Sequence, residues 1–292
     1  SPEQQAERVR RLHRGGRVAL LVRLLDRTRL VGMAGKRGLI MGVANHNSIA
    51  WGIAQALHQH GAELAFTCQG HALERRVRPL AEQVGSDIVE LCDVEDMEVL
   101  GSVFDRLSSR WDRLDFVVHA IAYSDKEELK GYYVDTSQEN FRRTMDVSCY
   151  SFTAVAHHAA KLMTNGGSLL SLSFYGAEKV MPNYNVMGVA KAALEASIKY
   201  LANDLGPQSI RVNGISAGPM RTLAGSAIGG ARDILRRSQE VAPLSRALCQ
   251  EDIGGGALYF LSDLSKSVTG EIHHIDSGYN AIGMSFVDSR LE

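Results

Sequence analysis

A tyrosine and a lysine stand seven residues apart in a segment that we expect to be helical. Tyr184 and Lys191 are separated by two helical turns, so their side chains project from the same face. An ammonium beside a phenol favours the phenolate and any negative charge that develops nearby. Taken alone, such a pair is more often an ordinary tyrosine and lysine at a helix rim. We predict that this helix begins near Tyr184, with Pro182 at its start and Asn183 as its N-cap.

The elements that must position this pair are short apolar runs that alternate with helical patterns. We expect seven strands, at residues 38–43, 63–67, 87–91, 114–122, 167–173, 210–216 and 271–275. Helices are predicted at residues 49–57, 71–84, 97–107 and 136–163 and from about residue 184. Continuous apolar strands joined through helices are typical of a parallel sheet that is buried on both faces. The predicted fold is α/β, a single-domain, Rossmann-type doubly wound sheet of about seven strands.

Ligands of such a sheet bind beyond the carboxyl ends of its strands. The segments expected there are residues 42–48, 67–69, 93–94, 119–122, 173–175 and 216–222. They would line one crevice, which Tyr184 and Lys191 would overlook. The first of these segments joins a strand to a helix through small residues, with Ser48 where a helix cap would lie. Such a turn lets backbone N–H groups approach a pyrophosphate, although the GxGxxG pattern is absent and the turn alone is a weak signal.

The second and third strands end in residues that could read an adenosine. An acidic residue after the second strand usually binds the ribose hydroxyls, and an arginine there suits a 2′-phosphate. This chain has Gln69, which can bind a ribose but neither repels nor neutralises a phosphate. NAD(H) is therefore favoured over NADP(H). Asp93 and Val94 could flank the adenine, and each could equally be a plain strand-end residue.

Composition excludes several classes of function. The 292 residues carry a net charge of −1, with 45% hydrophobic and 22% charged residues. Residues 1–32 have eight arginines and three acidic residues, a net +5, so the remainder is at −6, which gives no reason to expect nucleic-acid binding. No apolar run reaches the ~20 residues that span a bilayer. Adjacent histidines point apart, so no metal site is expected, and four dispersed cysteines suggest a reduced, cytoplasmic setting.

The two ends of the predicted domain differ in character. We expect residues 1–33 to be a basic N-terminal tail, either mobile or a non-native extension, because Arg23 interrupts an apolar run too short for a secretory signal. Residues 34–292 contain no linker-like stretch and would form one catalytic domain. Within it, residues 222–236 include three glycines, so a helix there would be weak and could act as a mobile lid.

Several motifs occur in a fixed order along the chain. They are Gly42-Val43-Ala44 with Ser48-Ile49-Ala50, Gly61 to Thr67, Tyr175 to Glu178, Pro182 to Gly188, Arg211-Val212-Asn213 and Ser216 to Pro219. Together with the step from Tyr184 to Lys191, they resemble the bacterial NADH-dependent enoyl-[acyl-carrier-protein] reductases of the short-chain dehydrogenase/reductase superfamily. The resemblance covers about residues 34–284. Most of that superfamily uses Tyr-x-x-x-Lys, and this chain has Gly188 at the fourth position.

The resemblance implies a reaction of type II fatty acid synthesis. NADH would give hydride to C3 of a trans-2-enoyl thioester on acyl carrier protein, and charge would move to the thioester oxygen. Tyr184 would hydrogen-bond this oxygen, and Lys191 would bind the nicotinamide ribose and add positive potential. The resemblance assigns cofactor-binding positions to Gly42, Ala44, Ser48, Ile49, Gln69, Asp93, Val94, Ile121, Ala122, Lys191, Met220 and Thr222. It makes the lid a cover for the acyl chain, with Phe174, Tyr184, Met187 and Ile228 at the substrate, and a homotetramer is the family expectation.

Two departures from the family pattern stand out. The family usually has a second tyrosine ten residues before the catalytic one, where this chain has Phe174 followed by Tyr175. Adjacent residues of an extended segment face opposite ways, so Tyr175 is not expected to replace it. Ala120 and Ala122 replace a serine and a glycine after the fourth strand, and both remain small.

Two other functions stay open at this point. The chain could be a dehydrogenase/reductase of carbonyl groups, a class that usually has a serine 13 residues before the tyrosine, as Ser171 is here. The chain could also be a non-catalytic paralogue that binds a nucleotide or acyl carrier protein, and Phe174 is the feature that favours this. The seven-residue step from Tyr184 to Lys191 favours enoyl reduction.

Overall fold

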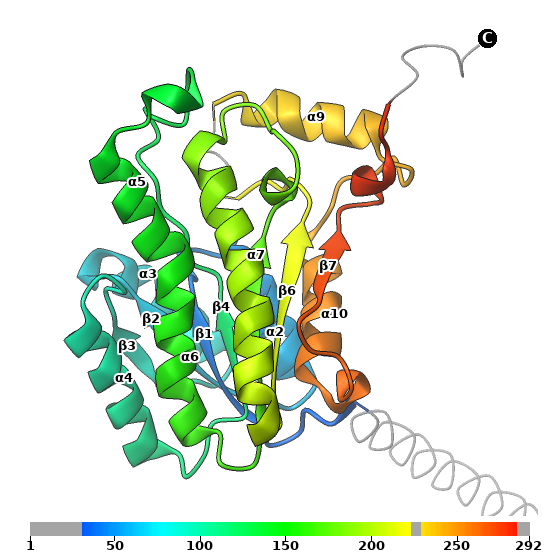
Figure 1. Ribbon diagram of the computed structural model, residues 1–292. Coiled ribbons are helices and arrows are strands. Elements are labelled where there is room, and N and C mark those ends of the chain that lie inside the picture. The colour runs from blue at the N-terminus through cyan, green and yellow to red at the C-terminus, as the bar shows by residue number, and fades with distance from the viewer. Residues whose placement is uncertain (1–30, 223–228, 285–292) are drawn as a thin grey trace, which may run out of the picture.

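Seven parallel strands form a single sheet in the computed structural model, which describes residues 31–222 and 229–284 (Figure 1). The strands are β1 Arg37–Met41, β2 Glu63–Cys68, β3 Val89–Leu91, β4 Phe116–His119, β5 Gly167–Ser173, β6 Ile210–Ala217 and β7 Ile272–Ile275. Their order in the sheet is β3-β2-β1-β4-β5-β6-β7, and every neighbouring pair is parallel. The predicted doubly wound α/β fold with about seven strands is confirmed.

Helices follow the strands along the chain and cover both faces of the sheet. They are α2 Ile49–Gln59, α3 His71–Gln83, α4 Met97–Arg110, α5 Gln138–Met145, α6 Ser151–Leu162, α7 Asn185–Leu205, α9 Ala231–Val241 and α10 Gln250–Leu261. Short 3₁₀ turns lie at Tyr133–Asp135, Tyr175–Ala177, Gly206–Gln208, Asp263–Ser265 and Tyr279–Ala281. Figure 1 shows α4, α6 and α7 on the near face of the sheet, with α2 and α10 on the far face.

Two apolar clusters fill the space between the sheet and its helix layers. Leu39 and Met41 of β1 belong to the cluster under α4, α6 and α7, whereas Ile40 belongs to the cluster under α2, α3 and α10. All three side chains are fully buried. Because successive residues of a strand face opposite sides, a strand covered on both faces must be apolar at every position. This explains the continuous apolar runs in the sequence.

The long helix predicted at residues 136–163 contains a π-helical turn. This turn, Asp146–Tyr150, separates α5 from α6. The hydroxyl of Ser148 donates to Tyr123 O at 3.0 Å and accepts from Tyr123 N at 2.9 Å. The π turn therefore anchors the loop that follows β4. A wider turn of this kind often lies beside a functional site.

Helix α10 was not predicted, because three consecutive glycines interrupt its helical pattern. Two of these glycines allow close packing. A Cβ at Gly254 would lie 3.0 Å from both Ala56 Cβ and Gly52 O of α2, and a Cβ at Gly256 would lie 2.1 Å from Ile275 Cδ1. Tertiary packing thus overrides the weak helix propensity of glycine in this segment.

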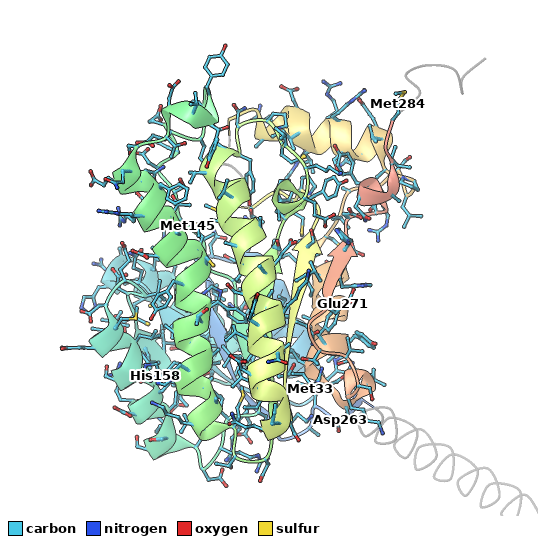
Figure 2. All side chains as sticks on the ribbon, viewed as in Figure 1. Met33, Met145, His158, Asp263, Glu271 and Met284 are labelled. Atoms are coloured by element: carbon cyan, nitrogen blue, oxygen red, sulfur yellow. The ribbon has the colours of Figure 1, made fainter. Side chains whose placement is uncertain are left out.

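Packed structure begins within the last residues of the segment assigned to the tail. Met33 is fully buried, and Gly35 N donates to Gly61 O at 2.9 Å. Figure 2 labels Met33 beside Asp263, at the end of the molecule opposite to Met284. Among the residues that the structure describes, no helix is both long and apolar enough to cross a bilayer.

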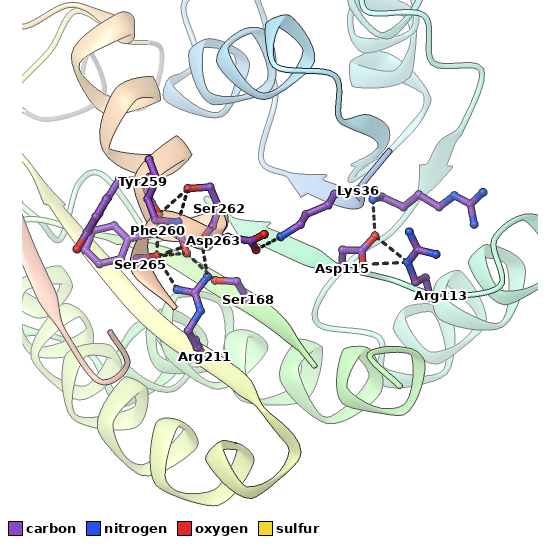
Figure 3. A network of polar contacts seen from close by, with 12 residues as sticks. Lys36, Arg113, Asp115, Ser168, Arg211, Tyr259, Phe260, Ser262, Asp263 and Ser265 are labelled. Atoms are coloured by element: carbon purple, nitrogen blue, oxygen red, sulfur yellow. Dashed lines mark hydrogen bonds and ion pairs between the residues drawn. The ribbon is translucent and has the colours of Figure 1, made fainter. Parts of the chain in front are cut away.

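A polar network closes the end of the sheet where the strands begin (Figure 3). Arg211 donates to Ser265 Oγ at 2.7 Å and to Ser262 O at 3.1 Å. Ser168 Oγ donates to Phe260 O at 2.9 Å. These bonds fasten the start of β5 and β6 to the end of α10. The network holds together the end of the sheet where the strands begin. The candidate site lies at the opposite end, beyond the carboxyl ends of the strands.

Candidate active site

A cavity of about 900 Å³ opens beyond the carboxyl ends of the strands. Its walls come from the segments that follow β1 to β6, from the start of α7 and from α9. The predicted site residues that line it are Gly42, Ala44, Ser48, Ile49, Gln69, Asp93, Val94, Ile121, Ala122, Phe174, Tyr184, Met187, Lys191, Met220 and Thr222. Ile228 lies outside the described residues. The structure therefore brings the described members of the predicted site into one cavity.

Two asparagines flank the tyrosine at the start of α7. Tyr184 is the N-cap residue of this helix, and the predicted cap, Asn183, has a different task. Asn183 Nδ2 donates to Gly229 O at 2.6 Å, and Asn185 Nδ2 donates to Glu128 O at 3.3 Å. Both asparagines have a positive φ, 56° and 31°, which asparagine tolerates better than most residues. Their side chains tie two separate loops to the helix that carries the tyrosine.

The ring of Tyr184 fits a slot that two glycines make. A Cβ at Gly176 would lie 2.3 Å from Tyr184 Cδ1, and a Cβ at Gly188 would lie 2.7 Å from Gly176 O. The ring of Phe174 packs edge-on against Tyr184, with 4.9 Å between the ring centroids. Position 188 is where a Tyr-x-x-x-Lys sequence would place its lysine. A side chain there would press on the backbone of Gly176, and the buried lysine of this chain lies three residues later, at position 191.

Lys191 lies buried on the same helix, with 6% of its surface exposed. Its Nζ donates to Leu172 O at 2.6 Å. Burial lowers the pKa of Lys191 to about 8, against the opposing charges of Cys149 and Glu195. Part of the lysine population therefore becomes neutral only slightly above physiological pH.

Tyr184 keeps its phenol proton in the protein without ligands, as the predicted role of its hydroxyl as a hydrogen-bond donor requires. Burial raises the pKa of Tyr184 well above that of a free phenol, and the charge of Glu195 adds to the effect. The side chain is 7% exposed. Tyr184 is thus a neutral phenol that can donate a hydrogen bond into the cavity.

Ser171, the residue that favoured carbonyl reduction, lies in the sheet and does not line the cavity. It is 1% exposed, and its Oγ donates to His119 O at 3.2 Å. His119 Nδ1 lies 3.2 Å from the same hydroxyl, and His119 Nε2 lies 2.8 Å from Ser151 Oγ. Burial lowers the pKa of His119 to about 3, with Lys191 contributing in the same direction. Both groups are structural members of the core.

Tyr175 points away from the cavity, as expected from its place beside Phe174. Its hydroxyl donates to Asn280 O at 3.4 Å, and its ring packs against His274 and Tyr279. It therefore does not replace the missing second tyrosine. At this part of the cavity the tyrosine hydroxyl comes from Tyr184, and its aromatic neighbour Phe174 is apolar.

The turn after β1 has the geometry that a close-approaching ligand needs. Gly42 has φ 106°, and a Cβ there would lie 2.0 Å from Ala120 O. Ser48 occupies the predicted cap position, but its Oγ accepts from Ala44 N at 3.0 Å and Asn45 N at 3.1 Å. Ser48 therefore braces the turn, and the first N–H groups of α2 keep no intrahelical acceptor.

The part of the cavity after β2 and β3, which was predicted to bind adenosine, contains more polar contacts than the sequence suggested. Gln69 Nε2 donates to Asp93 Oδ2 at 3.3 Å, so these two predicted residues orient each other. Arg143 was not predicted, and it donates to Glu95 Oε2 at 2.9 Å. Its guanidinium lies 4.4 Å from the ring centre of Tyr123. These contacts join segments far apart in the sequence, so no local pattern could have indicated them.

Several apolar residues of the cavity were absent from the predicted site, and Leu129, Ile234 and Leu235 are among them. Leu129 is buried in a small cluster with Tyr184 and Met187. Ile234 and Leu235 project into the cavity from α9, within the segment predicted to be a lid. Because most other residues of α9 are charged or polar, the two adjacent apolar residues could have predicted which face of this helix turns toward the cavity. The described residues contain no group of three side chains that could hold a metal ion.

Comparison with known proteins places the chain among enzymes with this architecture. The family model described as Enoyl-(Acyl carrier protein) reductase matches residues 42–280. The Enoyl-[acyl-carrier-protein] reductase [NADH] 1 of Rhizobium meliloti (strain 1021) is 61% identical over 257 residues, which cover 88% of this chain and 94% of that protein.

Solved structures agree with this assignment. FabI from Candidatus Liberibacter asiaticus has a TM-score of 0.86 and 55% identity, over 87% of this chain and 98% of that one. The reductase from Anaplasma phagocytophilum, solved in complex with NAD, has a TM-score of 0.84 and 55% identity, over 88% of this chain and 96% of that one. With a family model over most of its length and relatives this similar, the chain belongs to the enoyl-[acyl-carrier-protein] reductase family.

Proposed function

We propose that this chain reduces trans-2-enoyl thioesters carried by acyl carrier protein, with NADH as the hydride donor, as in type II fatty acid biosynthesis. The observation that carries this proposal is the buried pair Tyr184 and Lys191, at a seven-residue step, beside one cavity with a glycine turn. A lysine at position 188, as in the commoner Tyr-x-x-x-Lys pattern, would press on the backbone of Gly176. This supports enoyl reduction over the carbonyl reduction that is typical of that pattern. The names of the relatives supply the substrate class and the cofactor.

The residues present fit a dinucleotide such as NADH. The glycine turn at Gly42 and the unpaired N–H groups at the start of α2 suit a pyrophosphate. Gln69 and Asp93 offer side-chain groups to an adenosine and provide no cation for a 2′-phosphate, and the nearby Arg143 is ion-paired with Glu95. Ile121 and Ala122 would contact the nicotinamide ribose, and Met220 and Thr222 would contact the carboxamide and phosphate. The cavity volume of about 900 Å³ is in the range of cofactor sites.

The chemistry divides between the cofactor and the protein. NADH, when bound, supplies the hydride that reaches C3 of the enoyl thioester. As the double bond is reduced, negative charge develops on the thioester oxygen. The neutral Tyr184 hydroxyl would donate a hydrogen bond to this oxygen, and Lys191 would hold the ribose hydroxyls and add positive potential. C2 would then receive a proton from solvent or through Tyr184.

The acyl chain would lie against the apolar side of the cavity. Phe174 and Met187 line it next to Tyr184, and Ile234 enters from α9. The predicted lid at residues 222–236 includes the first half of α9, so closure of this helix would exclude water during the reaction. Ile228 belongs to the proposed lid on the strength of the sequence alone.

We also propose a cytoplasmic homotetramer that acts on acyl carrier protein. The cysteines that the structure places in the core, Cys68, Cys92 and Cys149, are free thiols, which suits a reducing compartment. Tyr150, at the end of the π turn before α6, and Tyr200 of α7 are 54% and 76% exposed. Exposed aromatic side chains such as these would contribute to a contact between subunits.

One assay separates the proposed function from the alternatives. Purified protein is mixed with NADH and either a trans-2-enoyl thioester or a 3-oxoacyl thioester, and the loss of NADH absorbance is followed. We expect oxidation of NADH with the enoyl thioester only. Oxidation with the 3-oxoacyl thioester alone would indicate a carbonyl reductase. Binding of NADH without oxidation in either mixture would indicate a non-catalytic paralogue.

A further inference from the structure

Glu195 is a partly buried carboxylate on the helix that carries Lys191, and the reaction proposed above does not use it. The two residues are four positions apart on α7, so they lie one turn from each other on the same face. Ser173, the last residue of β5, donates its hydroxyl hydrogen to Glu195 Oε1. Ser173 itself lines the cavity.

The end of β5 is therefore fastened to α7 at two consecutive residues. Lys191 Nζ donates to Leu172 O at 2.6 Å, and Ser173 Oγ donates to Glu195. The chain then continues into Phe174, whose ring packs against Tyr184. Any movement of β5 along α7 would shift the wall against which the phenol lies. The two bonds thus fix the distance between the helix and the strand at the cavity.

Glu195 also acts electrostatically on the two residues of the pair. Its charge raises the pKa of Lys191 against the effect of burial, and it raises the pKa of Tyr184 as well. The other groups that face Lys191 are Cys149 in the π turn and His119 on β4.

Glu195 has charged neighbours of its own. Burial raises the pKa of Glu195, the bond from Ser173 opposes this, and the surrounding charges are those of Glu178, His274 and Lys199. They lie respectively after the 3₁₀ turn at Tyr175–Ala177, on β7 and on α7 itself. His274 Nε2 lies 2.6 Å from Glu178 Oε1, so these two outer groups interact with each other.

We propose that Glu195 is a positioning residue of this active site, which anchors Ser173 at the end of β5 and, one helical turn from Lys191, adds a negative charge that favours the protonated lysine. The inference rests on the roles proposed above for Tyr184 and Lys191. It assigns two separable effects to one carboxylate. The hydrogen bond sets the geometry of the wall beside Tyr184, and the charge sets the pH range in which Lys191 is a cation.

The charge is tested with Glu195→Gln, which keeps an acceptor for Ser173 and removes the charge. The dissociation constant of NADH, from its fluorescence, and kcat/KM for the enoyl thioester are measured across the pH range around the Lys191 pKa. We expect the inflection of both curves to move to lower pH by about 0.5 to 1 unit. Glu178→Gln is the matched control, since it removes a neighbouring carboxylate from the surface and is expected to leave the inflection in place.

The hydrogen bond is tested separately with Ser173→Ala, which keeps the charge of Glu195. We expect kcat to fall roughly 3- to 10-fold with no movement of the inflection, because the wall beside Tyr184 loses one of its two anchors. Ser173→Thr retains a hydroxyl and should restore most of the rate. Circular dichroism spectra confirm that each variant is folded.

The outcomes separate this inference from the proposed function. An inflection in Glu195→Gln that coincides with that of the unmodified protein would overturn the role of the charge. Full activity in Ser173→Ala would overturn the role of the hydrogen bond. If the protein binds NADH with the expected inflection but reduces no enoyl thioester, the proposed function fails, while the NADH-binding curves of Glu195→Gln and Glu178→Gln still decide the role of the charge.

Discussion

Tyr184 and Lys191 are both buried, and burial acts in opposite directions on their pKa values. The phenol is held neutral, because burial raises its pKa, and the ammonium is brought close to losing its proton, because burial lowers the pKa of Lys191 to about 8. A neutral phenol can donate a hydrogen bond to a developing enolate, and a cation next to it strengthens the field at that oxygen. In the proposed mechanism the pair is therefore expected to work best below the Lys191 pKa.

The hydroxyl of Tyr184 can be removed without disturbing its ring. In Tyr184→Phe the ring keeps its slot between Gly176 and Phe174, so folding and NADH affinity should be unchanged. We expect kcat to fall roughly 100-fold, the usual loss when one donor to an oxyanion is removed. Steady-state kinetics with an enoyl thioester check the fall in kcat, and an NADH-binding titration checks the unchanged affinity. A variant with weakened NADH binding and an unchanged kcat would assign Tyr184 to the cofactor.

Lys191 should leave a signature in the pH dependence of activity. Because the proposed mechanism requires the protonated lysine, kcat/KM is expected to decline as the pH rises through about 8. The measurement is a pH profile of kcat/KM, and Lys191→Met serves as the comparison with weakened NADH binding. A profile that stays level to well above this pH would contradict the assigned role of the lysine.

The same lysine should affect stability with a definite sign. Its pKa is depressed in the folded protein from 10.5 to about 8, so the buried cation destabilises the fold at neutral pH, and this cost disappears as the pH rises from about 8 to 10.5. Without NADH, Lys191→Met should be more stable at neutral pH by up to about 3 kcal/mol. Urea unfolding at two pH values tests this, and a variant less stable at both would contradict it.

At the scale of elements, strands were easier to predict than helices. The strands β1, β2, β4, β5 and β6 are buried on both faces along most of their length, and this requires largely apolar runs that are visible in the sequence, whereas β3 and β7 at the sheet edges are only partly buried. Helix α10 was missed since its glycines serve contacts with α2 and Ile275, partners far away in the sequence. The cap at Asn183 was misassigned for a similar reason, because its side chain bonds to Gly229.

The three glycines of α10 should respond differently to alanine. A Cβ at Gly255 meets nothing within 4 Å, whereas one at Gly254 would press on the backbone of Gly52. Gly255→Ala should therefore raise the free energy of unfolding by about 0.5 to 1 kcal/mol through helix propensity. Gly254→Ala should lower it, because α2 and α10 must move apart. Denaturant unfolding of both variants is the test, and equal effects at the two positions would contradict the packing described.

At the scale of the whole molecule, the two ends of the parallel strands differ in function. The network around Arg211 closes the end where the strands begin (Figure 3), and the cavity lies at the opposite end. The motif Arg211-Val212-Asn213 lies at the end where the strands begin, and there Asn213 Nδ2 donates to Val268 O at 3.0 Å. A motif that resembled the family thus serves stability in this structure.

This division predicts a variant with lower stability and normal catalysis. Arg211→Met removes the bonds to Ser265 and Ser262 and leaves their oxygens without this donor. We expect the free energy of unfolding to fall by about 2 to 3 kcal/mol, with kcat and KM unchanged at a temperature where the variant is folded. Thermal unfolding and steady-state kinetics are the two measurements. A large loss of kcat in the folded variant would contradict this, because it would show that the network around Arg211 affects the active site at the other end of the strands.

The destination of the hydride tests the central claim most directly. The protein is incubated with NADH that is dideuterated at C4 of the nicotinamide, together with a trans-2-enoyl thioester, and the product is analysed by mass spectrometry and NMR. We predict a saturated acyl thioester with one deuterium, located at C3. Deuterium on a carbinol carbon when a 3-oxoacyl thioester is supplied, with none transferred to the enoyl thioester, would contradict the assignment of this site to enoyl reduction.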